Sequence, residues 1–322
     1  AYGNRGEYLN RAIEHMQQAM KDDPSASFLS GELASVYLQA GRIREAVTEL
    51  EQRIEKDPKD VEARRVLGNL YARLIGDPES GRINGEILAR AIEQYQKLVE
   101  NAPEDADGWL MLGRLHRLAR NPQGSEKAFQ RALEIEPDSE DAMMGLAMLY
   151  SSMGDNRRAA QLLKQLAGSN PSPRTLTSLA EAYEGMRDFA GAAEALSQLV
   201  ELDPSNLDFK RALAQDLQNA AGKADEALEI YAEVTREEPE DTQSWVRMSQ
   251  IYRRKREYAK AHEALARARQ AEPDNLEALY AEVSLLDAEG RTAEAVAAME
   301  RLLKSTEKSF YTAPERETRV TL

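Results

Sequence analysis

Apolar residues recur along the chain with the spacing of amphipathic helices, and the whole pattern repeats about every 34 residues. In each period, apolar positions 4, 7, 8 and 11 lie on one face of a first helix, because an α-helix turns by about 100° per residue. Positions 20, 24 and 27 form the stripe of a second helix. A proline at position 32 ends that helix, and it is found at Pro24, Pro58, Pro103, Pro137, Pro171, Pro204, Pro239 and Pro273.

Small residues and glycines support two closely packed helices per period. Position 20 is alanine in every repeat except one, where Ser125 stands, and position 8 is also small. Glycines such as Gly41 and Gly154 fall between the two helices, where a left-handed helix cap is needed. The pattern therefore predicts a series of helix–turn–helix units.

The repeat resembles that of the tetratricopeptide repeat (TPR) family, whose 34-residue unit carries a Trp-Leu-Gly-Tyr-Ala-Phe-Ala-Pro pattern. Trp109, Leu112, Gly113 and Phe129 match it within one repeat. The resemblance covers about residues 1–304 and implies an all-α, right-handed α-solenoid of helix–turn–helix repeats. The last repeat departs from the pattern, with Glu282 at apolar position 7 and Glu307 in place of the proline.

The repeats predict the organisation of the chain. Residues 1–26 are expected to form a half repeat with its second helix alone, which would leave Ile13 without its usual cover. Residues 27–304 are expected to form eight repeats in one solenoid, with an insertion near 75–88. The insertion is interpreted as a loop followed by an extra helical turn, and either as a tolerated surface insertion or as a partner-contacting loop.

The two ends of the chain are open to interpretation. Residues 305–322 form either a polar tail or the start of a further repeat. Because the first repeat lacks most of its first helix and Ala1 is not a methionine, we expect the chain to be part of a longer protein.

The amino-acid composition argues against several classes of function. The net charge of −14 and the pI of about 4.9 argue against binding to nucleic acid. The chain has no cysteine, and its three histidines lie in different repeats. We therefore expect no enzyme activity, no metal and no cofactor. No apolar stretch is long enough to span a membrane, so a soluble protein of the cytoplasm or the periplasm is expected.

What remains is surface chemistry. In the TPR family, positions 2, 5, 9 and 12 of the first helix line a groove that binds partner peptides. Carried over to this chain, these positions predict an apolar spot with a polar rim, although solenoids also expose scattered apolar residues without a function. The spot and its rim consist of Leu110, Met144 and Met148 with Arg65, Asn69, Arg114 and Arg117.

A second candidate surface is a positive patch in the seventh repeat. It includes Arg247, Gln250, Arg253 and Arg254. Cations near the end of a helix are also favoured by the helix dipole, so a structural explanation is equally open. The clamp with which some TPR domains hold acidic chaperone tails is not expected, because Met111, Asp141 and Gly145 stand at three of its positions.

These observations favour a protein-interaction scaffold that holds a partner peptide or helix with apolar and acidic residues in its groove. Two alternatives stay open. The chain could self-assemble through its terminal repeats, or it could be the adaptor region of a larger enzyme or of a secretion or envelope complex.

Overall fold

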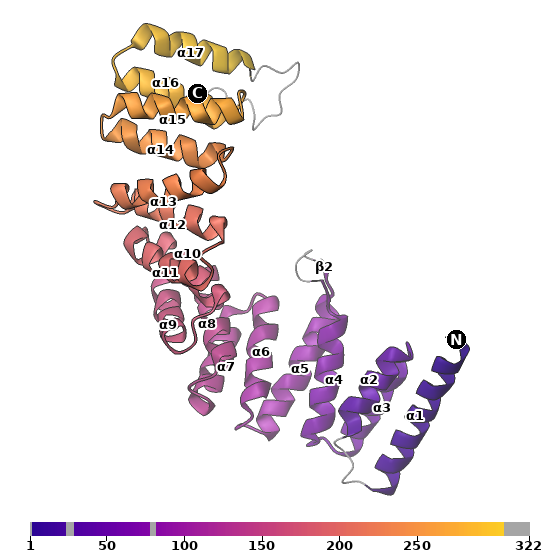
Figure 1. Ribbon diagram of the computed structural model, residues 1–322. Helices are drawn as coiled ribbons and strands as arrows, with labels where there is room; N and C mark the ends of the chain where they lie inside the picture. The colour runs from indigo at the N-terminus through magenta and orange to yellow at the C-terminus, as the bar shows by residue number, and fades with distance from the viewer. Residues whose placement is uncertain (1, 24–28, 78–81, 306–322) are drawn as a thin grey trace. The chain divides into compact units, whose positions relative to one another are not determined.

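The computed structural model of the chain describes residues 2–23, 29–77 and 82–305. These residues form α-helices and one short β-hairpin, which confirms the all-α helix–turn–helix solenoid. The chain divides into two compact units, residues 1–166 (unit 1) and residues 167–322 (unit 2), with the division inside α9. Figure 1 shows that successive helices stand side by side in chain order within each unit.

Each repeat contributes a first helix, here called helix A, and a second, helix B. The A helices of unit 1 are α2 (Leu29–Gln39), α4 (Val61–Leu74), α6 (Ala106–Leu118) and α8 (Glu140–Ser152). The B-type helices are α1 (Tyr2–Asp22), α3 (Ile43–Lys56), α5 (Gly85–Asn101), α7 (Pro122–Ile135) and α9 (Asn156–Ser169).

Unit 2 has the same alternation. Its A helices are α10 (Pro173–Gly185), α12 (Leu207–Asn219), α14 (Thr242–Arg254) and α16 (Leu276–Ala288). Its B helices are α11 (Phe189–Leu202), α13 (Ala224–Glu237), α15 (Tyr258–Ala271) and α17 (Thr292–Ser305).

Helix boundaries follow from the local sequence. The side chain of Asp60 accepts a hydrogen bond from the backbone N–H of Ala63 at the start of α4, and Asp105 does the same for α6. The turn between helices A and B contains a residue with positive φ, such as Gly41 at 71°. Where glycine is missing there, an arginine adopts the same conformation, as Arg120 does at 53°.

The predicted stripes form the core. The alanines of position 20 are buried, from Ala91 at 0% exposure to Ala295 at 6%. Ser125, the exception, is also fully buried, and its hydroxyl donates to the carbonyl of Gly113 at 2.9 Å. A hydroxyl is tolerated at this position because the hydrogen bond satisfies it.

The first helix corrects the prediction for the N-terminus. α1 runs without a break from Tyr2 to Asp22, so it also includes the residues expected to end a missing helix A. Ile13 is 1% exposed and Met16 is partly buried against the same core, because α1 packs on α2. The expectation that Ile13 lacks cover is therefore wrong.

The insertion forms more structure than a simple loop. Gly76–Asp77 (β1) pairs with Arg82–Ile83 (β2) as a short antiparallel hairpin. α5 then begins at Gly85 and has 17 residues, against 14 in α3 and α7. The predicted tail from 306 onward lies outside the described residues.

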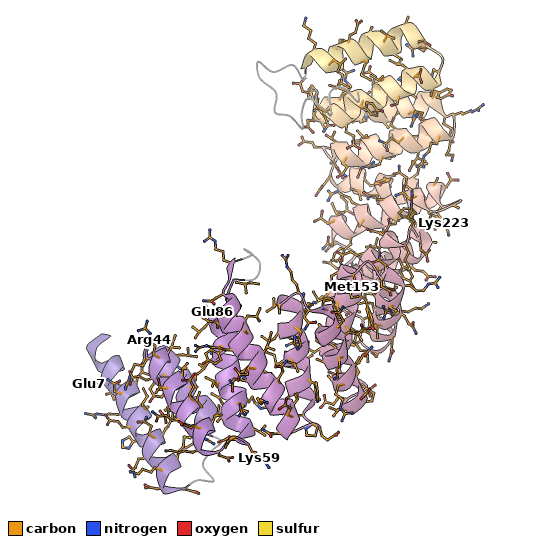
Figure 2. All side chains as sticks on the ribbon, turned by 180° about the vertical axis from the view of Figure 1, so that it is seen from behind. Glu7, Arg44, Lys59, Glu86, Met153 and Lys223 are labelled. Atoms are coloured by element: carbon orange, nitrogen blue, oxygen red, sulfur yellow. The ribbon has the colours of Figure 1, made fainter. Side chains whose placement is uncertain are left out.

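The two kinds of connection lie at opposite edges of unit 1. Figure 2 shows Arg44 and Glu86, which follow the turns inside two repeats, at one edge, and Lys59, which lies between repeats, at the other. Between these edges, A helices of consecutive repeats contact one another, as α2 does with α4 and α6 with α8. We call the exposed side of these A helices the helix-A face.

Candidate partner-binding surface

The arginines predicted to rim the apolar spot are held by neighbouring acids. Arg65 forms ion pairs with Glu62 at 3.7 Å and with Asp105, the residue that caps α6. Arg114 pairs with Asp141 of the next A helix at 3.0 Å. Acidic residues of the chain therefore largely compensate the charges of Arg65 and Arg114. Both arginines also link consecutive repeats, because Asp105 and Asp141 belong to the repeat that follows.

Arg117 and Asn69 differ from these two. The Nε of Arg117 is buried without a hydrogen-bond partner among the described residues. Asn69 is exposed, and its side-chain oxygen accepts a hydrogen bond from the Tyr95 hydroxyl at 2.8 Å. This bond orients the Asn69 amide on α4 and leaves its NH₂ group to donate elsewhere.

The structure corrects the predicted apolar spot. Leu110 is 8% exposed and Met144 is 7% exposed, so both belong to the core of unit 1. Met148 is half-buried. An apolar residue at a groove position was expected to face a partner, but here the packing of adjacent A helices covers two of the three side chains.

A cleft on the helix-A face lies between α2 and α4. It has a volume of about 230 Å³, and it is lined by Gly31, Ala34, Ser35, Leu38, Val66, Asn69, Leu70 and Arg73. The cleft exists because α2 carries small residues at Gly31 and Ser35, where larger side chains would fill the space. Each helix contributes apolar and polar side chains to the lining, with Leu38 and Ser35 on α2 and Leu70, Asn69 and Arg73 on α4.

Arg73 provides the charge of this cleft. It is exposed in the last turn of α4, and it forms no ion pair with any residue that the structure describes. Asn69 lies one turn earlier on the same helix. The cleft thus combines an apolar floor with an amide and a guanidinium group, which suits an apolar side chain next to a carboxylate.

Sequence reasoning found Asn69 but missed the rest of the cleft. The groove positions of the first complete repeat are Gly31, Ser35 and Leu38, and small residues there were a readable signal. Arg73 lies one position beyond the groove set, at the end of its helix. Large and charged residues at groove positions indicate possible contacts, whereas small residues such as Gly31 and Ser35 indicate space for a partner side chain.

The positive patch of unit 2 is also partly compensated. Arg247 donates to Gln250 at 3.3 Å and pairs with Glu277 at 3.4 Å. Arg254 donates to the backbone carbonyl of Gln218 at 3.4 Å. Arg253 is half-buried and forms no ion pair with the described part of the chain. The patch therefore holds fewer available charges than the sequence indicates.

The histidines do not come together. His116 is half-buried at position 11 of its repeat, and burial lowers its pKa. His262 lies 3.1 Å from a carboxylate oxygen of Glu289. Within residues 2–23, 29–77 and 82–305, no three His, Asp or Glu side chains gather as metal ligands would. None of the helices described is long and apolar enough to cross a membrane.

Family models confirm the resemblance. Models of the tetratricopeptide repeat match residues 9–70, 183–250 and 246–310. The TPR domain of cytochrome c-type biogenesis protein H matches residues 96–185. The chain is a tetratricopeptide repeat protein.

Individual relatives share part of the chain. Cytochrome c-type biogenesis protein CcmH of Escherichia coli (strain K12) is 31% identical over 99 residues, which are 30% of this chain and 28% of that protein. The human PEX5-related protein is 35% identical over 74 residues, 23% of this chain and 12% of the relative. The chain spans less than a third of the length of either relative.

Among solved structures, the C-terminal part of a TPR repeat-containing protein from Cytophaga hutchinsonii aligns with a TM-score of 0.58. The two chains are 14% identical, and the alignment covers 78% of this chain and 98% of that one. At this identity the likeness shows the fold alone.

Proposed function

We propose that this TPR protein is an interaction scaffold that binds a segment of a protein partner on its helix-A face, with the cleft between α2 and α4 as one contact point. The observation that carries the proposal is the cleft itself, which exposed Arg73 lines together with Leu38 and Asn69 and in which Arg73 forms no ion pair with any described residue. The tetratricopeptide fold is generally a non-catalytic scaffold, and this role agrees with the family to which the chain belongs.

The cleft defines the chemistry of the partner. An apolar side chain would lie against half-buried Leu38, above the buried side chains of Val66 and Leu70. Because these two expose little surface, the apolar contact and the polar contacts would share in the affinity. A carboxylate next to it in the partner would meet Arg73, and a backbone carbonyl would accept from Asn69. Charged contacts of this kind also set orientation and the rate of association.

The proposal is tested with peptides selected from a random peptide library on the immobilised chain. We expect the selected peptides to combine an apolar residue with a nearby Asp or Glu. Arg73→Glu should weaken their binding by about tenfold, because it replaces attraction with repulsion at the cleft. Ser35→Leu should weaken it as well, because leucine fills the space between α2 and α4.

Arg44→Glu is the matched control. Arg44 is an exposed arginine of unit 1 at the start of α3, outside the residues that line the cleft. It receives the same change of charge, and binding should stay as in the wild type. If Arg73→Glu and Ser35→Leu both leave the affinity unchanged, the partner does not use this cleft.

A further inference from the structure

Unit 2 has a cavity that is separate from the cleft of unit 1. It lies between α15, α16 and α17 (Figure 1), and its volume is about 360 Å³. α16 packs against both of its neighbours, so two B helices and the A helix between them bound the cavity. Leu286 of α16 and Ala297 of α17 are the apolar residues of its lining, and the other lining residues carry ionisable side chains.

Position 11 of helix A indicates what is missing from this cavity. Five repeats carry a tyrosine there, and in four of them a cation lies against the ring, 4.1–5.9 Å from its centroid. The hydroxyls of three of these tyrosines donate to a glutamate at 2.8–2.9 Å. The four pairs are Tyr37 with Arg42, Tyr71 with Arg90, Tyr150 with Arg158, and Tyr252 with Lys260.

The last repeat lacks this ring but keeps the positions around it. Leu286 stands at position 11 and is 5% exposed. Arg291 has the same place in its repeat as Arg42, which lies against the Tyr37 ring in the first complete repeat. His262 has the same place as Glu126, which accepts from the Tyr150 hydroxyl of the following repeat. Because Arg291 and His262 both line the cavity, it lies where other repeats hold a tyrosine side chain.

A second small residue keeps this place open. Ala297 is exposed at position 22 of the last repeat. The sixth repeat also has a leucine at position 11, Leu217, but its position 22 is Leu228, which is 9% exposed. A buried leucine side chain is available to fill the space there, whereas Ala297 offers only a methyl group.

The polar lining of the cavity suits a phenol. Arg301 is exposed near the end of α17 and forms no ion pair with any residue that the structure describes. A guanidinium group attracts the face of an aromatic ring. Glu282 accepts from Arg269 at 2.9 Å, and its carboxylate has lone pairs left for a further donor. The cavity thus offers the cation and the carboxylate that tyrosine rings meet in other repeats.

We propose that this cavity binds a tyrosine side chain of a protein partner, which takes the place of the ring that is missing at Leu286. The ring lies over Ala297 with Arg301 on its face, and its hydroxyl donates to Glu282. Leu286 exposes little surface, so the cation and the hydrogen bond distinguish tyrosine from aliphatic side chains. The site shares no residue with the cleft of unit 1, so this inference goes beyond the proposed function and does not depend on it.

The test is an NMR titration of the full chain with N-acetyl-L-tyrosinamide. We expect saturable shifts of the backbone amides of Leu286 and Ala297. N-acetyl-L-leucinamide, which has neither a ring nor a hydroxyl, should bind about tenfold more weakly. Equal affinity for the two amides, or shifts confined to other parts of the chain, would overturn the proposal.

Two variants close the cavity. Leu286→Tyr builds the aromatic ring of the other repeats into the chain, and Ala297→Leu copies the leucine of the sixth repeat. Each should abolish the shifts at the cavity, while the far-ultraviolet circular dichroism stays that of the wild type. Ala293→Leu is the matched control, because Ala293 is an exposed alanine of α17 outside the lining, and it should bind as the wild type does. If both cavity variants bind N-acetyl-L-tyrosinamide like the wild type, the ring does not bind here and the proposal fails.

Tyr311→Ala separates a partner's tyrosine from one of the chain itself. Tyr311 follows α17 in the sequence and lies outside the described residues. An unchanged affinity of this variant for N-acetyl-L-tyrosinamide supports a partner as the source of the ring. A clear rise in affinity would show that Tyr311 competes for the cavity, which contradicts the assignment to a partner.

Discussion

Single residues decide how closely the helices of unit 1 approach. Phe129 of α7 is fully buried, and it fits because glycines face its ring from both neighbouring A helices. A Cβ atom at Gly113 of α6 would lie 2.7 Å from the ring, and one at Gly145 of α8 would lie 2.6 Å from it. The large side chain of Phe129 at position 24 therefore requires glycine at positions 113 and 145, which face it.

Phe129→Ala should lower the free energy of unfolding by about 3–5 kcal/mol, because it leaves a cavity between three helices. Denaturant unfolding followed by circular dichroism measures the change. Gln130→Ala, at an exposed position next to it in the same helix, should stay within about 0.5 kcal/mol of the wild type. A small loss for Phe129→Ala would show that the site collapses around the missing ring.

A residue that breaks the repeat pattern has a structural reason. Glu282 stands at a position that is apolar in the other repeats. The structure pairs it with Arg269 of α15, whose guanidinium donates to its carboxylate at 2.9 Å. The ion pair replaces the apolar contact at this point of the last repeat.

At the scale of the helix, caps also tie one repeat to the next. Asp241 caps α14 by accepting from the backbone N–H of Ser244 at 3.3 Å, and it accepts from the Nε of Arg211 on α12 at 2.7 Å. Asp105 of α6 combines the same two tasks with Arg65 of α4. A cap that accepts an arginine from the preceding A helix is therefore a recurring joint in both units.

Asp241→Ala should cost about 1–2 kcal/mol of stability at pH 7, because helix α14 loses its cap and Arg211 loses a partner. Burial opposes ionisation of Asp241, but hydrogen bonds from Arg211 and Ser244 outweigh it and lower its pKa. Its contribution is therefore present above about pH 4 and is lost as the pH falls further. Urea unfolding at pH 7 and pH 3 checks both statements.

Ser139→Ala serves as the control for this prediction. Ser139 is the N-cap residue of α8, but its side chain makes no capping hydrogen bond. Its replacement should change stability little at either pH. An equal loss in both variants would show that the hydrogen bonds of Asp241 do not cause the effect.

At the scale of the whole molecule, folding depends on contacts between neighbouring helices. In a repeat protein each repeat is stabilised chiefly by the repeats beside it, and the helices of each unit contact their neighbours in chain order. The chain has no cysteine, and its described residues gather no set of three metal-ligating side chains.

We therefore expect that an excess of EDTA leaves the thermal unfolding midpoint of the protein unchanged. Differential scanning calorimetry with and without the chelator measures it, and Zn²⁺ or Mg²⁺ added to chelator-treated protein provides the reverse comparison. A clear drop in the midpoint that added metal restores would contradict the expectation.

The sequence by itself determined the repeat, its helices and most of its core. Spacing alone placed Ala91 and Leu146 inside, because residues three or four apart on a helix share a face and the 34-residue period repeats that face. It also located the turns at Gly41 and Gly154, where the backbone needs positive φ.

The tertiary structure alone decided what the surface offers. Arg65 and Asp105 lie 40 residues apart in sequence, so no local pattern indicates that they meet. No local pattern indicates the burial of Leu110 or the cleft beside Arg73 either. Burial, ion pairing and empty space on the helix-A face depend on how one repeat packs on the next, and this packing is a property of side chains far apart in the chain.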